Sequence, residues 1–217
     1  MRIHRYKDGS HTINQQLFTK TIIKRFCPDN ASYGTPTYQD TPEPLLYQPQ
    51  KKYEPTEAES RLIQKEFSNL KYVSAVCTLL YLALGTRPDI TWIVMKLAKS
   101  CKEPGIADYN ALLHLLGYLR KYNNYAIKYY ANEEESPVYK ICRTHNIEPT
   151  DITAFSDASW QDCKDTRRST IGNKIFYYVG LIEWKSNMPT PVAQSSAESE
   201  YMAACSACMA MSHLSMW

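Results

Sequence analysis

The spacing of apolar residues changes along this chain, and that change constrains the fold more than any other feature of the sequence. Between residues 56 and 122, apolar side chains recur every three or four positions, which is typical of amphipathic helices. After Asp151 apolar and polar residues alternate, which is typical of half-buried strands. The alternating runs are Ile152–Phe155, Lys174–Val179 and Ile182–Trp184. Ser195 or Ser196 then caps a final helix. These patterns predict an α+β chain in which a helical unit precedes a three-strand antiparallel meander and one helix.

The remaining segments give the expected domain boundaries. Residues 1–26 predict a short strand, a turn at Asp8-Gly9 and a helix. Six of the twelve prolines lie in residues 27–55, which predicts an extended connector that lies across a surface. Residues 125–131 predict a strand, and the acidic residues 132–149 predict an exposed loop. We therefore divide the chain into an N-terminal segment with its connector (1–55), a helical region (56–131) and a partial C-terminal domain (151–217).

Local signals indicate where individual elements begin and bend. Thr56 and Glu59 have the spacing of a capping box, which predicts a helix start. Pro88 is expected in the first turn of a further helix, where its missing N–H costs no hydrogen bond. Gly172 and Gly180 are expected to mark the bends of the meander.

Composition narrows the environment in which the chain works. The net charge of +3 permits a polyanionic partner without requiring one. Seven cysteines without the spacing of a disulfide scaffold indicate free thiols in a reducing compartment. The N-terminal residues lack the apolar core of a secretory signal, and no apolar run approaches the roughly 20 residues that span a bilayer. An intracellular location, cytoplasmic or nuclear, without membrane contact is therefore expected.

Two acidic residues lie at the ends of predicted elements. Asp157 follows the strand pattern ending in Phe155-Ser156, and Glu200 lies in the first turns of the last predicted helix. Taken singly, Asp157 is a common turn former and Glu200 an ordinary acid favoured by the helix dipole. Taken together, two carboxylates at element ends can meet as ligands of a divalent metal. Phosphodiester hydrolysis uses two Mg²⁺ ions about 4 Å apart, and Mg²⁺ prefers such hard oxygen ligands.

Several blocks of the sequence resemble the Pol polyproteins of copia-type LTR retrotransposons. Leu79-Leu-Tyr-Leu82 and Thr86-Arg-Pro-Asp-Ile90 are similar to the family's block after the reverse transcriptase fingers and palm. Gly117-Tyr-Leu-Arg120 corresponds to the family's Arg-Tyr-Leu-Lys, with glycine in place of the first basic residue. The blocks that resemble the ribonuclease H region are Ser156-Asp-Ala-Ser-Trp160, Asp165-Thr-Arg-Arg-Ser-Thr-Ile-Gly172 and Ser195-Ser-Ala-Glu-Ser-Glu-Tyr201.

The resemblance implies an incomplete ribonuclease H-like domain that uses Mg²⁺ to cut RNA in RNA–DNA hybrids. In the family the acid before the tyrosine of the last block is a metal ligand. This implies Asp157 and Glu200 as catalytic and metal-binding residues, and Ser159 replaces a second, less critical acid. Lys164, Arg167 and Arg168 are expected to contact backbone phosphates, which position a duplex without reading its sequence. Expected partners are an RNA–DNA hybrid or other nucleic acid, and the remainder of the Pol polyprotein.

The resemblance also implies that some catalytic residues of the family lie outside this sequence. The paired aspartates of the palm would precede Met1, and the family's third metal-binding aspartate would follow Trp217. We therefore expect an incomplete two-metal site within residues 1–217, and enzyme activity is left open. The alternative is a catalytically inactive transposon remnant or a nucleic-acid-binding fragment.

Overall fold

A computed structural model describes residues 1–28, 31–49, 55–68, 70–148, 152–164, 166–178 and 180–214. The chain folds into two compact units. One unit contains residues 1–2 and 14–126 and is called the helical unit below. The other contains residues 3–13 and 127–217 and is called the sheet unit. Within the described residues, no helix is both long and apolar enough to cross a membrane.

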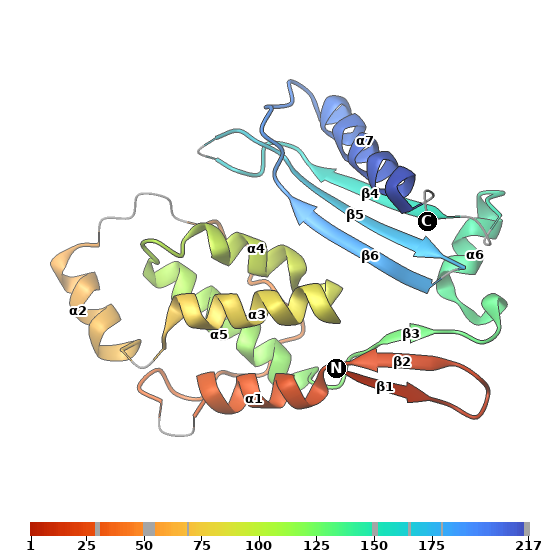
Figure 1. The fold of residues 1–217 in the computed structure, drawn as a ribbon. Coiled ribbons are helices and arrows are strands. Elements are labelled where there is room, and N and C mark those ends of the chain that lie inside the picture. Colours follow the sequence, from red (N-terminus) through yellow and green to blue (C-terminus); the bar gives the residue numbers. More distant parts are fainter. Residues whose placement is uncertain are drawn as a thin grey trace. The chain divides into compact units, whose positions relative to one another are not determined.

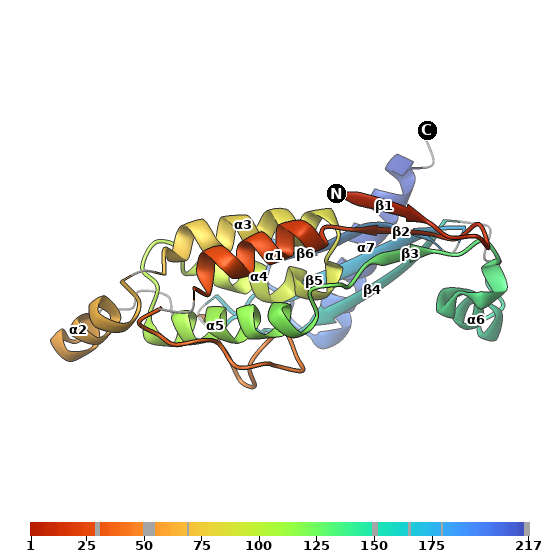
Figure 2. The same cartoon turned by 90° about the horizontal axis from the view of Figure 1, so that it is seen from below.

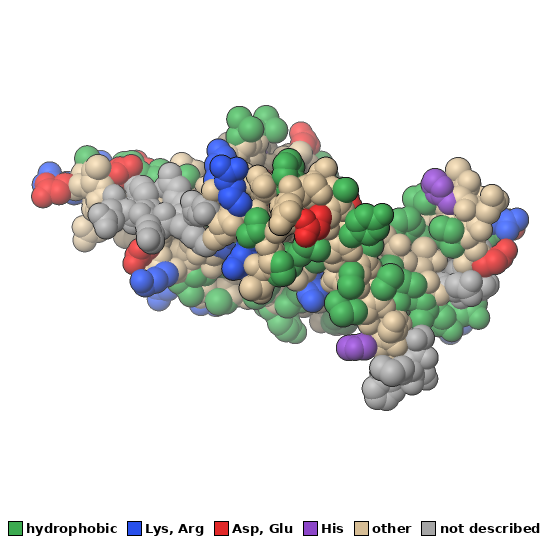
Figure 3. Space-filling model, turned by 90° about the horizontal axis from the view of Figure 1, so that it is seen from above, with side chains coloured by type: hydrophobic (Ala, Val, Ile, Leu, Met, Phe, Trp, Pro, Cys, Tyr) green, Lys and Arg blue, Asp and Glu red, His purple; other side chains and the backbone are tan. Residues whose placement is uncertain are grey.

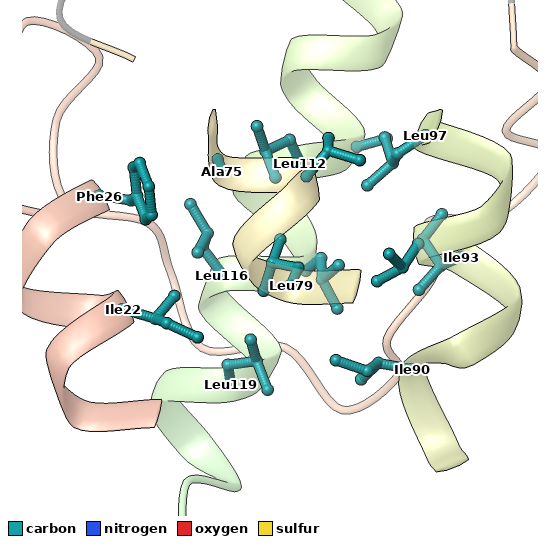
Figure 4. Close-up of a cluster of buried hydrophobic side chains, with 14 of the residues drawn as sticks. Ile22, Phe26, Ala75, Leu79, Ile90, Ile93, Leu97, Leu112, Leu116 and Leu119 are labelled. Atoms are coloured by element: carbon teal, nitrogen blue, oxygen red, sulfur yellow. The ribbon is translucent and has the colours of Figure 1, made fainter. Parts of the chain in front are cut away.

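The helical unit is built from helices around one apolar core, as predicted from apolar residues that recur every three or four positions. Its elements are α1 (Gln16–Phe26), α2 (Glu57–Glu66), α3 (Tyr72–Gly85), the 3₁₀ turn η1 (Pro88–Ile90), α4 (Thr91–Lys99) and α5 (Ile106–Lys121). Fully buried side chains from α3, α4 and α5 meet those of α1 in the centre (Figure 4). Leu79, Leu97 and Leu112 each expose none of their surface, so this core supplies the main apolar burial of the unit.

The start signals in this unit act largely as predicted. The Thr56 hydroxyl accepts from the backbone N–H of Glu59, whose carboxylate accepts from the N–H of Thr56, and this capping box begins α2. Pro88 begins the 3₁₀ turn, and α4 itself begins three residues later at Thr91. The helix α5 begins at Ile106, where the carboxylate of Asp108 accepts from the N–H of Gly105.

The connector lies across the helical unit, along α5 (Figure 2). Arg120 donates to the carbonyl oxygen of Pro36, and the Tyr122 hydroxyl donates to Asp40 over 3.0 Å. Gly117 lies where the connector passes closest, because a Cβ built on it would overlap the carbonyl oxygen of Thr37. Close packing against the connector therefore explains why this position holds glycine and not the family's basic residue.

The sheet unit begins with a small three-stranded sheet. Its strands are β1 (Arg2–Arg5), β2 (His11–Asn14) and β3 (Ile127–Tyr129), in the order β1-β2-β3. β2 and β3 are antiparallel, with His11 opposite Tyr129. The sequence predicted only one strand before α1, but the turn at Asp8-Gly9 closes a hairpin, with Gly9 at φ +88° and Ser10 hydrogen-bonded to Asp8.

The expectation of an exposed loop over residues 132–149 is wrong for the residues that the structure describes. A 3₁₀ turn η2 (Glu133–Glu135) is followed by α6 (Pro137–Thr144). Ser136 caps α6 by accepting from the N–H of Val138, and Pro137 occupies the first helical position. Cys142 anchors the helix because its side chain is fully buried.

The second sheet and its helix have the predicted topology. β4 (Thr153–Ser159), β5 (Thr170–Tyr177) and β6 (Gly180–Asn187) form an antiparallel meander, and α7 (Ser196–Leu214) packs on β4 and β5 (Figure 1). The expected bend at Gly172 is wrong, because Gly172 lies inside β5 between Asp157 of β4 and Ser186 of β6. The pairing between β5 and β6 is irregular instead between Ile175 and Phe176.

Candidate functional site

The candidate site lies at one end of the second sheet. β4 ends at Ser159, the hairpin of residues 160–169 leads into β5, and α7 begins at Ser196. The Trp160 Nε1 donates to the carbonyl oxygen of Ala193 over 3.2 Å, which ties the hairpin to the segment before α7. The end of β4, the hairpin and the first turn of α7 therefore lie at the same end of the sheet (Figure 1).

Asp157 lies in β4, two residues before the strand ends. Its side chain is exposed, and its cross-strand partner is Gly172, which has no side chain. The next residue across the sheet is Ser186, whose buried hydroxyl has no hydrogen-bond partner among the described residues. The residue directly opposite Asp157 therefore contributes no side chain against its carboxylate.

Glu200 lies one turn inside α7. Its neighbour Ser199 is buried against the sheet, whereas Glu200 is exposed. The helix is capped by Ser195, whose hydroxyl accepts from the N–H of Glu198, while the Glu198 carboxylate accepts from the N–H of Gln194 over 2.6 Å. The two acids of this block thus have different roles in the structure: Glu198 stabilises the helix start and Glu200 faces solvent.

The strand register limits where the two carboxylates could meet. Asn173 of β5 donates to Ser206 of α7, so the face that carries Asn173 is the one that α7 covers. Ser156 is opposite Asn173, and because side chains alternate along a strand, Asp157 lies on the other face. β4 is an edge strand of this sheet. An ion held by both Asp157 and Glu200 would therefore lie beside the outer edge of β4.

The donor set suits a hard cation that keeps part of its water shell. Both carboxylates are exposed and have no hydrogen-bond or ion-pair partner among the described residues, so their oxygens are ligands of the type that Mg²⁺ prefers. The described residues contain no group of three or more His, Cys, Asp or Glu side chains that could hold a metal ion. Metal binding by Asp157 and Glu200 therefore remains a prediction, with two protein ligands at most from the described part of the chain.

The basic residues of the sequence analysis lie together on the hairpin. Lys164 and Arg167 are exposed, and Arg168 is half-buried. Two backbone hydrogen bonds hold the hairpin. The N–H of Arg167 donates to the carbonyl oxygen of Cys163 over 2.8 Å, and the N–H of Cys163 donates to the carbonyl oxygen of Arg168 over 3.2 Å. Arg167 has a positive φ of 54°. Three basic groups are therefore presented from a fixed turn.

Sequence reasoning missed the residues that hold this hairpin. Gln161 accepts from Arg167 Nη1 over 3.2 Å, and the Thr170 hydroxyl donates to Asp162 over 2.9 Å. Trp160 was singled out only as part of a motif, although its indole connects the hairpin to Ala193. The sequence indicates these contacts only through the many polar side chains between the two strands. Such a run does not specify which side chains hydrogen-bond to one another.

The outward face of α7 carries apolar side chains. Tyr201 is 77% exposed and Met209 is 58% exposed, and hydrophobic side chains gather over this helix in Figure 3. Cys205 and Cys208 on the same helix are exposed as well, and both are free thiols. Within the described residues, nothing covers this face.

Comparison with known proteins gives matches along most of the chain. An uncharacterised mitochondrial protein of Arabidopsis thaliana is 32% identical over 130 residues, which are 60% of this chain and 48% of that protein. The secreted RxLR effector protein 161 of Plasmopara viticola is 30% identical over 135 residues, 62% of this chain and 84% of that protein. The retrovirus-related Pol polyprotein from transposon TNT 1-94 of Nicotiana tabacum is 27% identical over 192 residues, 88% of this chain and 13% of the polyprotein.

These matches agree with the motifs, and along most of its length the chain is similar to copia-type retrotransposon Pol polyproteins. It spans about half the length of the mitochondrial relative (48%) and about an eighth of the TNT 1-94 polyprotein (13%). No protein-family profile matches the chain. No solved structure matches it either.

Proposed function

We propose that residues 152–214 are the ribonuclease H-type part of a Pol polyprotein, and that their hairpin end binds an RNA–DNA hybrid. The observation that carries this proposal is that the elements bearing two exposed carboxylates and three basic residues end or begin at one end of one small sheet. Similarity to Pol polyproteins supports the assignment, because the acids and basic residues lie in blocks that resemble those of the family.

The basic hairpin would hold the nucleic acid. Lys164, Arg167 and Arg168 neutralise backbone phosphates, and such contacts give affinity and orientation without base specificity. The two backbone hydrogen bonds that join Cys163 to Arg167 and Arg168 reduce the conformational freedom that these residues lose on binding. Arg167 is additionally oriented by its bond to Gln161.

Asp157 and Glu200 would hold Mg²⁺ at the same end of the sheet. When bound, Mg²⁺ supplies charge stabilisation for the attacking and leaving oxygens of the phosphodiester. The exposed carboxylates would bind the ion through oxygen, and the absence of a side chain on Gly172 leaves Asp157 accessible. The end of the sheet would thus combine negative groups for the metal with positive groups for the phosphates.

We further propose that a carboxylate from elsewhere in the polyprotein completes the metal site. Each misplaced or missing ligand of a two-metal site costs several kcal/mol of transition-state stabilisation. Residues 1–217 alone should therefore bind a hybrid and cut it weakly or not at all. A polypeptide extended with the family's next strand and its aspartate should cut it.

The test compares binding and cleavage of one RNA–DNA hybrid by the purified polypeptide of residues 1–217 and by the extended polypeptide, in Mg²⁺ and in Mn²⁺. We expect both to bind and only the extended one to cut efficiently, with Asp157→Asn abolishing the cutting. Efficient cutting by residues 1–217 that Asp157→Asn abolishes would show that two protein carboxylates suffice. Cutting that survives Asp157→Asn would refute the assignment of Asp157. No hybrid binding by either polypeptide would refute the proposal as a whole.

A further inference from the structure

A pocket opens on the helical unit, separate from the carboxylates and the basic hairpin. It has a volume of about 360 Å³ and lies between α1, the end of α5 and the start of the connector. Its walls include Lys20 and Lys24 of α1, Arg120 of α5 and Tyr38 of the connector. Pockets that bind small ligands occupy about 300–1,000 Å³, so this one has the volume for a ligand of the size of a mononucleotide.

Three cationic side chains line this pocket, and none of the lining residues that the structure describes is acidic. Lys20 and Lys24 lie one helical turn apart on α1, are exposed, and have no ion-pair partner among the described residues. Arg120 donates to the carbonyl oxygen of Pro36, and its remaining N–H groups have no hydrogen-bond partner within the described residues. Asp40 of the same connector is engaged by Lys121 and Tyr122 and does not line the pocket.

The pocket also has an aromatic wall. Tyr38 is 63% exposed, and the Arg120 guanidinium lies 5.0 Å from the centre of its ring. A guanidinium at this distance orients a tyrosine ring by cation–π attraction and leaves the other ring face open. Exposed aromatic faces of this kind stack on nucleobases, because every base has a π-face.

The buried thiol in the wall does not change the charge of the pocket. Burial raises the pKa of Cys27 to about 11, and the nearby Arg120 lowers it only in part. The thiol is therefore neutral at physiological pH. The lining keeps three formal positive charges beside an aromatic face.

We propose that this pocket binds a nucleotide phosphate, with Lys20, Lys24 and Arg120 around the phosphate and Tyr38 stacked on the base. Phosphate accepts hydrogen bonds from ammonium and guanidinium groups, and these charge-assisted bonds are the strong ones. A free nucleotide and the 5′-phosphorylated end of a nucleic acid strand both present this chemistry. The site is independent of the proposed hybrid-binding function, which rests on residues 152–214.

The experiment titrates the purified polypeptide of residues 1–217 with AMP, adenosine, inorganic phosphate and a 5′-phosphorylated oligonucleotide, followed by amide chemical shifts in ¹⁵N NMR. We expect AMP to saturate a set of shifts at Ile23, Thr35, Tyr38 and Asn123, with adenosine and phosphate each binding at least tenfold more weakly. Tighter binding of the oligonucleotide at the same amides identifies a strand end as the ligand, and tighter binding of AMP identifies a free nucleotide. AMP shifts that lie elsewhere, or no saturable shifts, overturn the proposal.

Variants separate the pocket from non-specific charge. Lys20→Glu with Lys24→Glu should weaken AMP binding more than tenfold, and either single reversal should weaken it too, whereas Lys65→Glu, a single reversal on the exposed face of α2, should leave it unchanged. Tyr38→Ala should abolish the preference for AMP over inorganic phosphate, and Tyr38→Phe should retain it. Replacing Lys164, Arg167 and Arg168 by Gln should not affect AMP binding, which keeps this test separate from that of the sheet unit. Equal loss with Lys65→Glu, or an unchanged preference in Tyr38→Ala, contradicts the proposed site.

Discussion

Arg87 and Asp89 form a bidentate ion pair inside the helical unit. Arg87 Nε lies 2.9 Å from Asp89 Oδ1, and Arg87 Nη2 lies 2.7 Å from Asp89 Oδ2. Arg87 is 2% exposed and donates also to the carbonyl oxygen of Tyr122, while the Tyr118 hydroxyl donates to Asp89 over 2.9 Å. The Arg-Pro-Asp of the shared block therefore joins η1 to α5, and its arginine is not available for nucleic acid.

Replacing Arg87 by Met should destabilise the chain by about 3–5 kcal/mol, because Asp89 would remain as a partly buried charge without its partner. The free energy of unfolding in urea, measured at neutral pH, checks this. Arg61→Met is the matched control, since Arg61 pairs with Glu57 on the exposed face of α2 and should cost about 0–1 kcal/mol. Similar losses for both variants would contradict a structural role of the buried pair.

Gly117→Ala should destabilise the helical unit by about 1–3 kcal/mol, because the added methyl group overlaps the Thr37 carbonyl and forces the connector away from α5. Gly172→Ala is the control. A Cβ at Gly172 meets only the carbonyl oxygen of Lys185, at 3.9 Å, which is an ordinary contact. Thermal unfolding of both variants gives the comparison, and an unchanged midpoint for Gly117→Ala would show that the connector does not lie against α5.

Removing the hairpin charges should reduce both hybrid affinity and its salt dependence. Each phosphate contact contributes a slope of about −0.9 to the plot of log K against log salt concentration for duplex DNA. Replacing Lys164, Arg167 and Arg168 by Gln should therefore flatten the slope by about 2–3 if all three contact phosphates. Fluorescence anisotropy at several salt concentrations measures it. The control replaces Lys140 and Arg143 of α6 by Gln and should leave the slope unchanged; an equal change would mean non-specific attraction.

Alkaline pH should destabilise the chain partly through Cys27. Burial raises the pKa of this thiol from 9.0 to about 11, so the folded state holds its proton more tightly than the unfolded state. The stabilisation that follows is complete below pH 9 and is lost as the pH rises toward 11. The free energy of unfolding of the natural chain should thus fall more steeply over this interval than that of Cys27→Ala. Parallel curves would contradict a raised pKa.

Local sequence patterns predicted much of the fold where one pattern dominated. The alternation after Asp151 predicted three antiparallel strands, and the apolar spacing over residues 56–122 predicted the helical region that contains α3 and α5. These elements bury a regular face, so their periodicity is strong. The helix α6 was missed because it has only eight residues and follows a run of acidic residues; the Ser136 cap, Pro137 and the burial of Cys142 stabilise it.

The residues of the candidate site come from sequence motifs and their roles stay predictions, whereas their arrangement could not be predicted from the sequence. Motifs identified Asp157, Glu200 and the three basic side chains, and the structure places the elements that carry them at one end of the sheet. The face on which Asp157 lies depends on register, since a shift of one residue would move every side chain to the other face. Gly172 was expected to bend the chain, yet it pairs with Asp157 inside β5. Such long-range pairing leaves no local signal in the sequence.

The most direct test of the proposed metal site is paramagnetic broadening of ¹⁵N NMR signals by Mn²⁺ added to the purified polypeptide of residues 1–217. If Asp157 and Glu200 share one ion, the amides of both should broaden with a single saturation curve. Asp157→Asn should then abolish the broadening at Glu200 as well, while Glu183→Gln on β6 should leave both unchanged. Independent saturation at the two positions, or broadening at Glu200 that survives Asp157→Asn, would contradict a shared metal ion.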